Sequence, residues 1–191
     1  PPQWRQGDWP AHPVIDHFRR FFDFHPQFEE PQIRRLLAAY YGACSFLDEQ
    51  IGRVLTQLEA LGLTQSTRVI YSSDHGEHLG GRGIFGKFSL YDESAAVPMI
   101  AAGPDVPQGA VCRTPTSLVD LYPSIIESVG AESHNDDAGL PGRSLWTIAS
   151  NPDAQRTVLS EYHAVGSQHA SYMIRDERYK YNHYVGAPAQ L

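Results

Sequence analysis

The sequence has 191 residues, a formal net charge of −7 and two cysteines. This length fits one domain with a small appendage, and the negative charge argues against a nucleic acid or an anionic membrane surface as partner. No apolar run reaches the roughly 18 residues of a membrane span, and two cysteines cannot form a disulfide framework. The opening segment does not resemble a signal peptide, so we expect the middle of a longer chain, with cytoplasm and periplasm both open as compartments.

The first 30 residues are dense in proline, which prevents long helices. Residues 14–24 could hold one short helix. His12, His17 and His25 fit no metal-ligand spacing, and we expect them in turns or at the surface.

The strongest helical pattern begins at Pro31, a residue suited to the first helical turn. Apolar residues recur every three to four positions from Ile33 to Leu58, and Gly62 is a natural stop. The pattern predicts a long helix with one buried stripe, in which Cys44 is a small core residue.

The central segment, residues 68–99, carries the chemistry. Residues 69–71 form a short β-branched and aromatic run that predicts a buried strand. Asp74 and His75 lie just past its end, and a loop with five glycines then leads to Lys87. Ligands of open α/β sheets bind beyond the carboxyl ends of strands, so these three side chains stand where such folds place their sites.

Those three groups suit one kind of chemistry. Aspartate and neutral histidine bind divalent cations, and lysine supplies a compact positive charge with three donors. Together they could neutralise a sulfate or phosphate oxyanion during transfer. The alternative, a strand-end turn followed by a solvated lysine, stays open on spacing alone.

The stretch SSDHGEHLGGRGIFGKFSLYDESAAVPMIAAGP closely resembles the second metal-binding segment of the sulfatase family, in the alkaline-phosphatase-like superfamily. Histidine after the aspartate is more typical of its choline-sulfatase and phosphonate monoester hydrolase branch. The resemblance implies that Asp74 and His75 bind a divalent metal, calcium above all, with manganese or magnesium as alternatives. It also implies that Lys87 is catalytic and contacts the sulfate oxygens.

After the central loop, residues 97–102 predict a second buried strand, and Ser117 caps a helix over residues 118–129 in which Asp120 is structural. Strands are predicted at 157–162, 171–175 and 178–182, the last two joined by Asp176 and Glu177. The expected fold is α/β. Residues 1–150 would form half of an alkaline-phosphatase-like parallel sheet with flanking helices, and residues 151–191 part of a small antiparallel sheet.

Glu161 and His163 follow the strand at 157–162 and are candidates for the substrate side of the pocket. A carboxylate there could face a cationic substrate, as in choline-sulfatase-like enzymes. The alternative is that Glu161 only ties the small sheet to the core.

The sulfatase nucleophile is a formylglycine made within C-x-P-S-R or C-x-A-S-R. Cys44 is followed by Ser-Phe-Leu and Cys112 by Arg-Thr-Pro, so neither matches. We therefore expect the C-terminal half of a sulfate-ester hydrolase, inactive alone and partnered by its missing N-terminal half, with a small sulfate ester as substrate. A phosphonate or phosphodiester hydrolase and a non-catalytic module remain alternatives, and a homo-oligomer is open.

Overall fold

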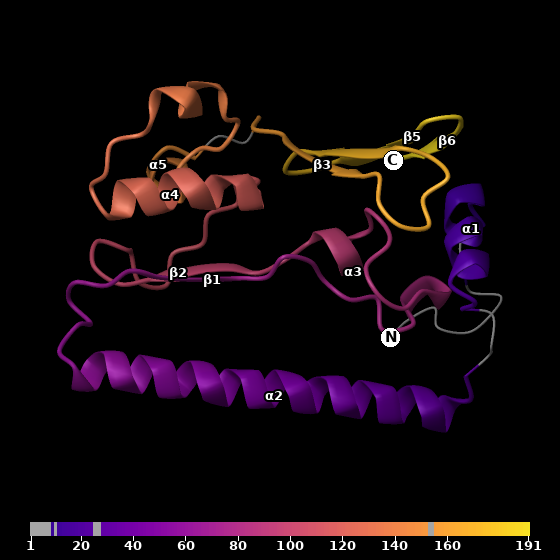
Figure 1. The fold of residues 1–191 in the computed structure, drawn as a ribbon, viewed down its shortest axis with the longest axis horizontal. Helices are drawn as coiled ribbons and strands as arrows, with labels where there is room; N and C mark the ends of the chain where they lie inside the picture. Colours follow the sequence, from indigo (N-terminus) through magenta and orange to yellow (C-terminus); the bar gives the residue numbers. More distant parts are fainter. Residues whose placement is uncertain (1–8, 10, 25–27, 153–154) are drawn as a thin grey trace. The chain divides into compact units, whose positions relative to one another are not determined.

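The computed structural model describes residues 9, 11–24, 28–152 and 155–191. It divides into two compact units, Pro1–Gln108 and Gly109–Leu191 (Figure 1). The domain boundary expected at residue 150 stays a prediction. Within the described residues, no helix combines the length and the apolar character that crossing a bilayer requires.

In the first unit, the short helix predicted near the start is α1, Pro13–Phe21. It begins with a proline, and Val14, Ile15 and Phe18 on one of its faces are buried. His12, expected at the surface, is instead only 5% exposed, because it stands at the helix N-terminus next to this apolar face. His17 is half-buried, and His25 lies outside the described residues.

Helix α2, Glu30–Ala60, confirms the long helix of the sequence pattern. Its N-terminus is closed by a capping box between Glu29 and Gln32, and Gly62 follows its end with a φ of +70°. The predicted burial of its stripe is not observed. Ile33 is its one buried residue, and Cys44, expected in the core, is exposed.

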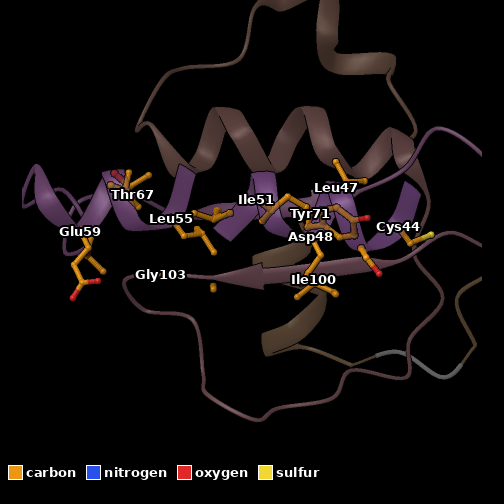
Figure 2. A pocket seen from close by; sticks show the side chains of 15 residues that line it. Cys44, Leu47, Asp48, Ile51, Leu55, Glu59, Thr67, Tyr71, Ile100 and Gly103 are labelled. Carbon is orange, nitrogen blue, oxygen red and sulfur yellow. The ribbon is translucent and has the colours of Figure 1, made fainter. Parts of the chain in front are cut away.

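A groove between α2 and the strand pair explains that exposure (Figure 2). Leu47, Ile51 and Leu55 line it from the helix, and Tyr71 and Ile100 from the strands. A two-stranded ribbon offers too little surface to cover a helix of 31 residues. The apolar stripe therefore faces an open groove rather than a filled core.

Strands β1, Val69–Ser72, and β2, Met99–Ala102, form near the predicted positions, but neither is buried as predicted: β1 is half-buried throughout, and Ile100 of β2 is 59% exposed. The two strands pair antiparallel, with Ser72 opposite Met99. The parallel pairing expected here is wrong. Parallel neighbours require a crossover that returns the chain to the starting end of the first strand. Residues 73–98 instead fold into a loop, with η1 at Gly81–Gly83 and the short helix α3 at Asp92–Ala95, so β2 starts beside the point where β1 stops.

The second unit opens with the helix predicted over residues 118–129, which forms as η2, Leu118–Asp120, and α4, Leu121–Ser128. Then come η3, Asn135–Gly139, and α5, Leu145–Ser150. Trp146 ties α5 to α4, because its Nε1 donates to the Ser128 hydroxyl at 2.8 Å and to the Ser124 carbonyl at 3.0 Å.

The predicted antiparallel sheet forms, with four strands where three were predicted, in the order β3-β4-β5-β6. They are β3, Val158–Tyr162, β4, Ser171–Arg175, β5, Lys180–Tyr184, and β6, Ala187–Gln190. The loop between β4 and β5 has four residues, not the predicted two. A two-residue type I′ turn needs a positive φ at both central residues, which Glu177 disfavours in the position usually taken by glycine. The Asp176 carboxylate instead accepts the backbone N–H groups of Arg178 and Tyr179, at 2.7 and 2.5 Å.

Candidate active site

The end of β1 brings the first two predicted site residues to one place. The Ser73 hydroxyl donates to the His75 carbonyl at 2.8 Å, and the His75 N–H donates to Asp74 Oδ1 at 3.0 Å. These bonds bend the chain just past the strand. Asp74 Oδ2 then lies 3.4 Å from His75 Nε2. The side chain of Asp74 is 83% exposed.

A close backbone approach holds this bend. The Gly76 N–H donates to the Ser94 carbonyl at 2.7 Å. A Cβ atom at Gly76 would lie 2.2 Å from the backbone oxygen of Glu93, so no larger residue fits without moving α3. Here the glycine is required for space.

The imidazole of His75 has a defined orientation. Its Nδ1 lies 2.9 Å from the Gly76 carbonyl, a contact that only a protonated Nδ1 makes favourable. The lone pair of Nε2 is then directed outward, and Lys87 Nζ lies 2.5 Å from it. Metal-binding histidines commonly donate their other ring N–H to a backbone carbonyl in this way.

Lys87 reaches His75 because Glu77 closes the glycine-rich loop. Glu77 Oε1 accepts the N–H of Gly86 at 2.6 Å and of Leu79 at 3.0 Å. The Ser94 hydroxyl donates to the Lys87 carbonyl at 2.7 Å. The loop is thus fastened immediately before Lys87 and at Lys87 itself, and the lysine side chain stays exposed.

Sequence reasoning missed the buried support beneath this loop. His78 is 2% exposed, and its Nε2 lies 2.8 Å from the Ser89 hydroxyl, which accepts the Tyr91 N–H at 3.1 Å. Burial lowers the pKa of His78 against the opposing effects of Glu93 and Glu77, so the ring is held neutral. The residues directly after His75, Gly-Glu-His in the sequence, were the available signal for this buried support.

The charges at the site favour an ionised carboxylate. Partial desolvation raises the pKa of Asp74, but the neighbouring His75, two backbone hydrogen bonds and the charge of Lys87 together lower it below its ordinary value. An ionised carboxylate and a directed imidazole lone pair are a suitable donor pair for a divalent cation. The ammonium of Lys87 already faces that lone pair, which shows that Nε2 is aimed at a positive group.

Two ligands are fewer than a bound divalent ion requires. Among the residues that the structure describes, no group of three or more His, Cys, Asp or Glu side chains could hold a metal ion. Asp74 and His75 therefore fit a metal as part of a ligand set.

The predicted substrate residues lie in the second unit. His163 Nε2 is 3.3 Å from Glu161 Oε2, and both side chains are exposed. Glu161 stands opposite Tyr172 in the sheet register, and the His163 and Tyr172 rings are 5.0 Å apart. The pair is brought together, and its role toward substrate stays a prediction.

The chain is similar to known proteins. The sulfatase family profile matches residues 8–131. Arylsulfatase K of Mus musculus is 34% identical over 174 residues, which cover 86% of this chain and 31% of the mouse protein. Choline-sulfatase of Rhizobium meliloti is 32% identical over 162 residues, covering 85% of this chain and 31% of that enzyme.

Among solved structures, the phosphonate monoester hydrolase of Silicibacter pomeroyi superposes with a TM-score of 0.80 and 28% identity, over 93% of this chain and 40% of that one. The α/β class is confirmed, since the matched sulfatase structures have the alkaline-phosphatase-like fold. This chain spans about a third of the length of the curated relatives described above. With a profile match across more than half of its residues, the chain belongs to the sulfatase family.

Proposed function

We propose that this chain supplies the metal-binding and oxyanion-binding part of an enzyme that hydrolyses sulfate esters. The observation that carries the proposal is the convergence of Asp74, His75 and Lys87 at the end of β1, with Nε2 of His75 within 3.4 Å of Asp74 Oδ2 and 2.5 Å of Lys87 Nζ. Membership of the sulfatase family supports it.

In this proposal Asp74 and His75 hold a divalent cation, with Ca²⁺ expected and Mn²⁺ or Mg²⁺ as alternatives. When bound, such an ion supplies charge stabilisation to the oxyanion of the transferred group. Lys87 donates its N–H groups to the sulfuryl oxygens and neutralises the charge that develops as the ester bond breaks. Its exposed ammonium lies on a loop fastened by Glu77 and Ser94, where a bound sulfate ester could reach it.

The nucleophile, expected to be a formylglycine, would come from an N-terminal half that this chain does not contain. The lengths of the curated relatives support a longer whole protein, as the match covers 31% of the mouse arylsulfatase K. The exposed apolar stripe of α2, including Val54 at 67% and Leu47 at 49%, is the surface we expect the N-terminal half to cover.

The central experiment compares Lys87→Ala with wild type in the full-length protein that carries this chain. Loss of one oxyanion donor should lower kcat by about 10²- to 10³-fold on an aryl sulfate. Lys180→Ala is the matched control, since Lys180 is the second of the two lysines and lies in the small sheet. Unchanged turnover in Lys87→Ala would contradict the proposal.

Metal binding is tested separately by titrating Ca²⁺ and Mn²⁺ calorimetrically into the same protein. Asp74→Asn should weaken binding strongly because a charged ligand is lost, and Asp105→Asn, another exposed aspartate of the first unit, should not. Equal affinity in wild type and Asp74→Asn would remove Asp74 from the ligand set.

A second function is favoured by the superposition on a phosphonate monoester hydrolase. Hydrolysis of a phosphonate or phosphate diester would use the same cation and lysine. The ratio of kcat/KM for an aryl sulfate to that for an aryl phosphonate decides between the two.

The third alternative, a non-catalytic module, would hold if the full-length protein turned over neither substrate. The purified chain alone is expected to be inactive on a generic aryl sulfate.

We also propose that Glu161, beside His163, faces a cationic substrate group. Glu161→Gln in the full-length protein should raise KM for choline sulfate selectively over a neutral aryl sulfate. Glu177→Gln, in the β4–β5 turn, is the control. An equal loss on both substrates together with a lower Tm would assign Glu161 a structural role.

A further inference from the structure

We propose that Arg19 of α1 is a positioning residue for Lys87, which holds the turn at Arg82 in a left-handed conformation and thereby sets where the lysine stands. This inference rests on the function proposed above for Lys87. It gives a role to the N-terminal segment, which the sequence pattern left without one.

Arg19 is a buried cation directed at a loop. Its side chain is 3% exposed, and both Nε and Nη2 donate to the Arg82 carbonyl, at 3.0 and 2.6 Å. Nη1 donates to Asp16 at 2.6 Å, and the guanidinium lies 4.9 Å from the centre of the Trp9 ring. Burying a guanidinium is unfavourable unless its donors are used, and here two of them converge on one backbone oxygen 63 residues away.

The oxygen that Arg19 binds belongs to a strained turn. Arg82 has φ +57° and ψ 21°, a region in which a residue with a Cβ is disfavoured. Such a conformation persists only where surrounding contacts impose it. The Arg82 side chain is held on its other side, because Nε donates to Glu93 at 3.0 Å and the guanidinium stacks 4.3 Å from the Tyr91 ring.

The turn leads directly to Lys87. The Gly80 N–H donates to the Ile84 carbonyl at 2.8 Å, and the Ile84 N–H donates to Gly81 at 3.0 Å. Ile84 is fully buried, so the chain leaving the turn has a fixed starting point three residues before the lysine. A change in the peptide plane at Arg82 would therefore move this anchor.

The segment that carries Arg19 also holds the residues on both sides of Lys87. Phe22 stacks on Phe88 with ring centroids 3.9 Å apart, and Phe24 packs edge-on against Phe85 at 5.9 Å. These aromatic contacts supply burial, whereas Arg19 supplies the directed contact to the strained carbonyl. The two contributions can be separated by substitution.

The test measures the chemical accessibility of Lys87 directly. Lys87 and Lys180 are the chain's two lysines, so limited acetylation followed by mass spectrometry gives a Lys87-to-Lys180 ratio with an internal reference. In the full-length protein, Arg19→Met should change this ratio several-fold. It should also lower kcat by about 10- to 100-fold with a smaller change in KM, since a displacement of about 1 Å in a catalytic group costs this much.

Two further variants make the test specific. Asp16→Asn removes the negative charge that pairs with Arg19 but leaves the contact with Arg82, so the acetylation ratio and kcat should stay at wild-type values. Arg82→Gly removes the strain, because glycine adopts positive φ freely. Arg19→Met should therefore have little further effect in the Arg82→Gly background.

An unchanged ratio in folded Arg19→Met, or an equal change in both backgrounds, would overturn the proposal. If Arg19→Met does not fold, Arg19→Lys is used instead. It keeps the positive charge but offers one ammonium group in place of the two guanidinium donors, and it should change the acetylation ratio in the same direction by a smaller amount. The acetylation ratio does not depend on turnover. A failure of the proposed function, seen as an active Lys87→Ala protein, is therefore distinguishable from a failure of this inference.

Discussion

Two aspartates, one in each unit, show how differently the same side chain is used. Asp74 is 83% exposed at the end of β1, and one of its oxygens faces the Nε2 of His75. Asp120 is fully buried at the start of α4, and both of its oxygens are occupied. Its Oδ1 accepts from Arg156 at 2.7 Å and from the Arg143 N–H at 2.9 Å, and its Oδ2 accepts from the Ser117 N–H at 2.8 Å.

The two carboxylates differ in which groups their oxygens accept hydrogen bonds from. Asp120 uses its charge inside the protein to join a helix cap, a loop and Arg156, in agreement with the structural role predicted for it. Asp74 keeps an oxygen directed outward beside an imidazole and an ammonium. A carboxylate with unused, outward acceptor capacity suits ligand binding, whereas a saturated and buried one suits stability.

The largest expected effect comes from removing the buried carboxylate. Asp120→Ala removes the carboxylate that pairs with Arg156, which is 10% exposed, and frees two backbone N–H groups. Loss of one partner of a buried ion pair costs about 3–5 kcal/mol, so the second unit should unfold at much lower denaturant concentration. Asp74→Ala is the contrast, with an unchanged Tm but lost metal binding. Equal Tm losses in the two variants would erase the distinction.

The second prediction concerns the backbone approach at the exposed site. Gly76→Ala places a Cβ 2.2 Å from the Glu93 carbonyl oxygen, so α3 must move. Overpacking of this kind costs about 1–3 kcal/mol and should also abolish activity in the full-length protein. Gly81→Ala in the same loop meets its nearest atom at 3.9 Å and should be tolerated. Similar melting curves for both variants would show that the approach is not tight.

The third prediction is a pH dependence of stability from His78 beneath the loop. Its folded pKa lies below the ordinary value of 6.5, chiefly because of burial, while Glu93 and Glu77 oppose the shift and Arg82 adds to it. The unfolded state then binds more protons, so stability falls as the pH drops below about 6.5. Denaturant melts between pH 5 and 8 should show a free energy of unfolding that rises with pH and becomes constant above about pH 7.5.

Removal of His78 identifies the source of that slope. His78→Gln should flatten it even though the variant is less stable, and His134→Gln, at an exposed histidine, should leave it unchanged. A slope that survives His78→Gln would belong to another group.

The smallest expected effect is at the β4–β5 turn. Hydrogen bonds from the Tyr179 and Arg178 N–H groups lower the pKa of Asp176, so the ionised carboxylate stabilises the turn above pH 3.8 and this stabilisation is lost as the pH falls further. Asp176→Asn should lower the Tm slightly at pH 7, and the gap to wild type should narrow near pH 3. A gap that is constant with pH would assign the effect to shape alone.

The sequence by itself determined the elements whose signals are local. Proline at the start and Gly62 at the end delimit α2, and the run before Asp74 predicts β1, because caps and short apolar runs act within a few residues. The order Asp74, His75, glycine-rich loop, Lys87 also predicted the candidate site. A loop that closes back on the end of a strand brings the residues at its two ends close together, as in the contact between His75 and Lys87.

Only the tertiary structure decided how distant segments meet. The stripe of α2 has the pattern of a core helix, yet it faces a groove, because periodicity specifies which face is apolar and not what covers it. The antiparallel pairing of β1 and β2 depends on how residues 73–98 fold, and no local signal carries that. No motif in the sequence distinguishes Arg19 from the other arginines. Its contact with the Arg82 carbonyl joins residues 63 apart in sequence, and only the folded chain brings them together.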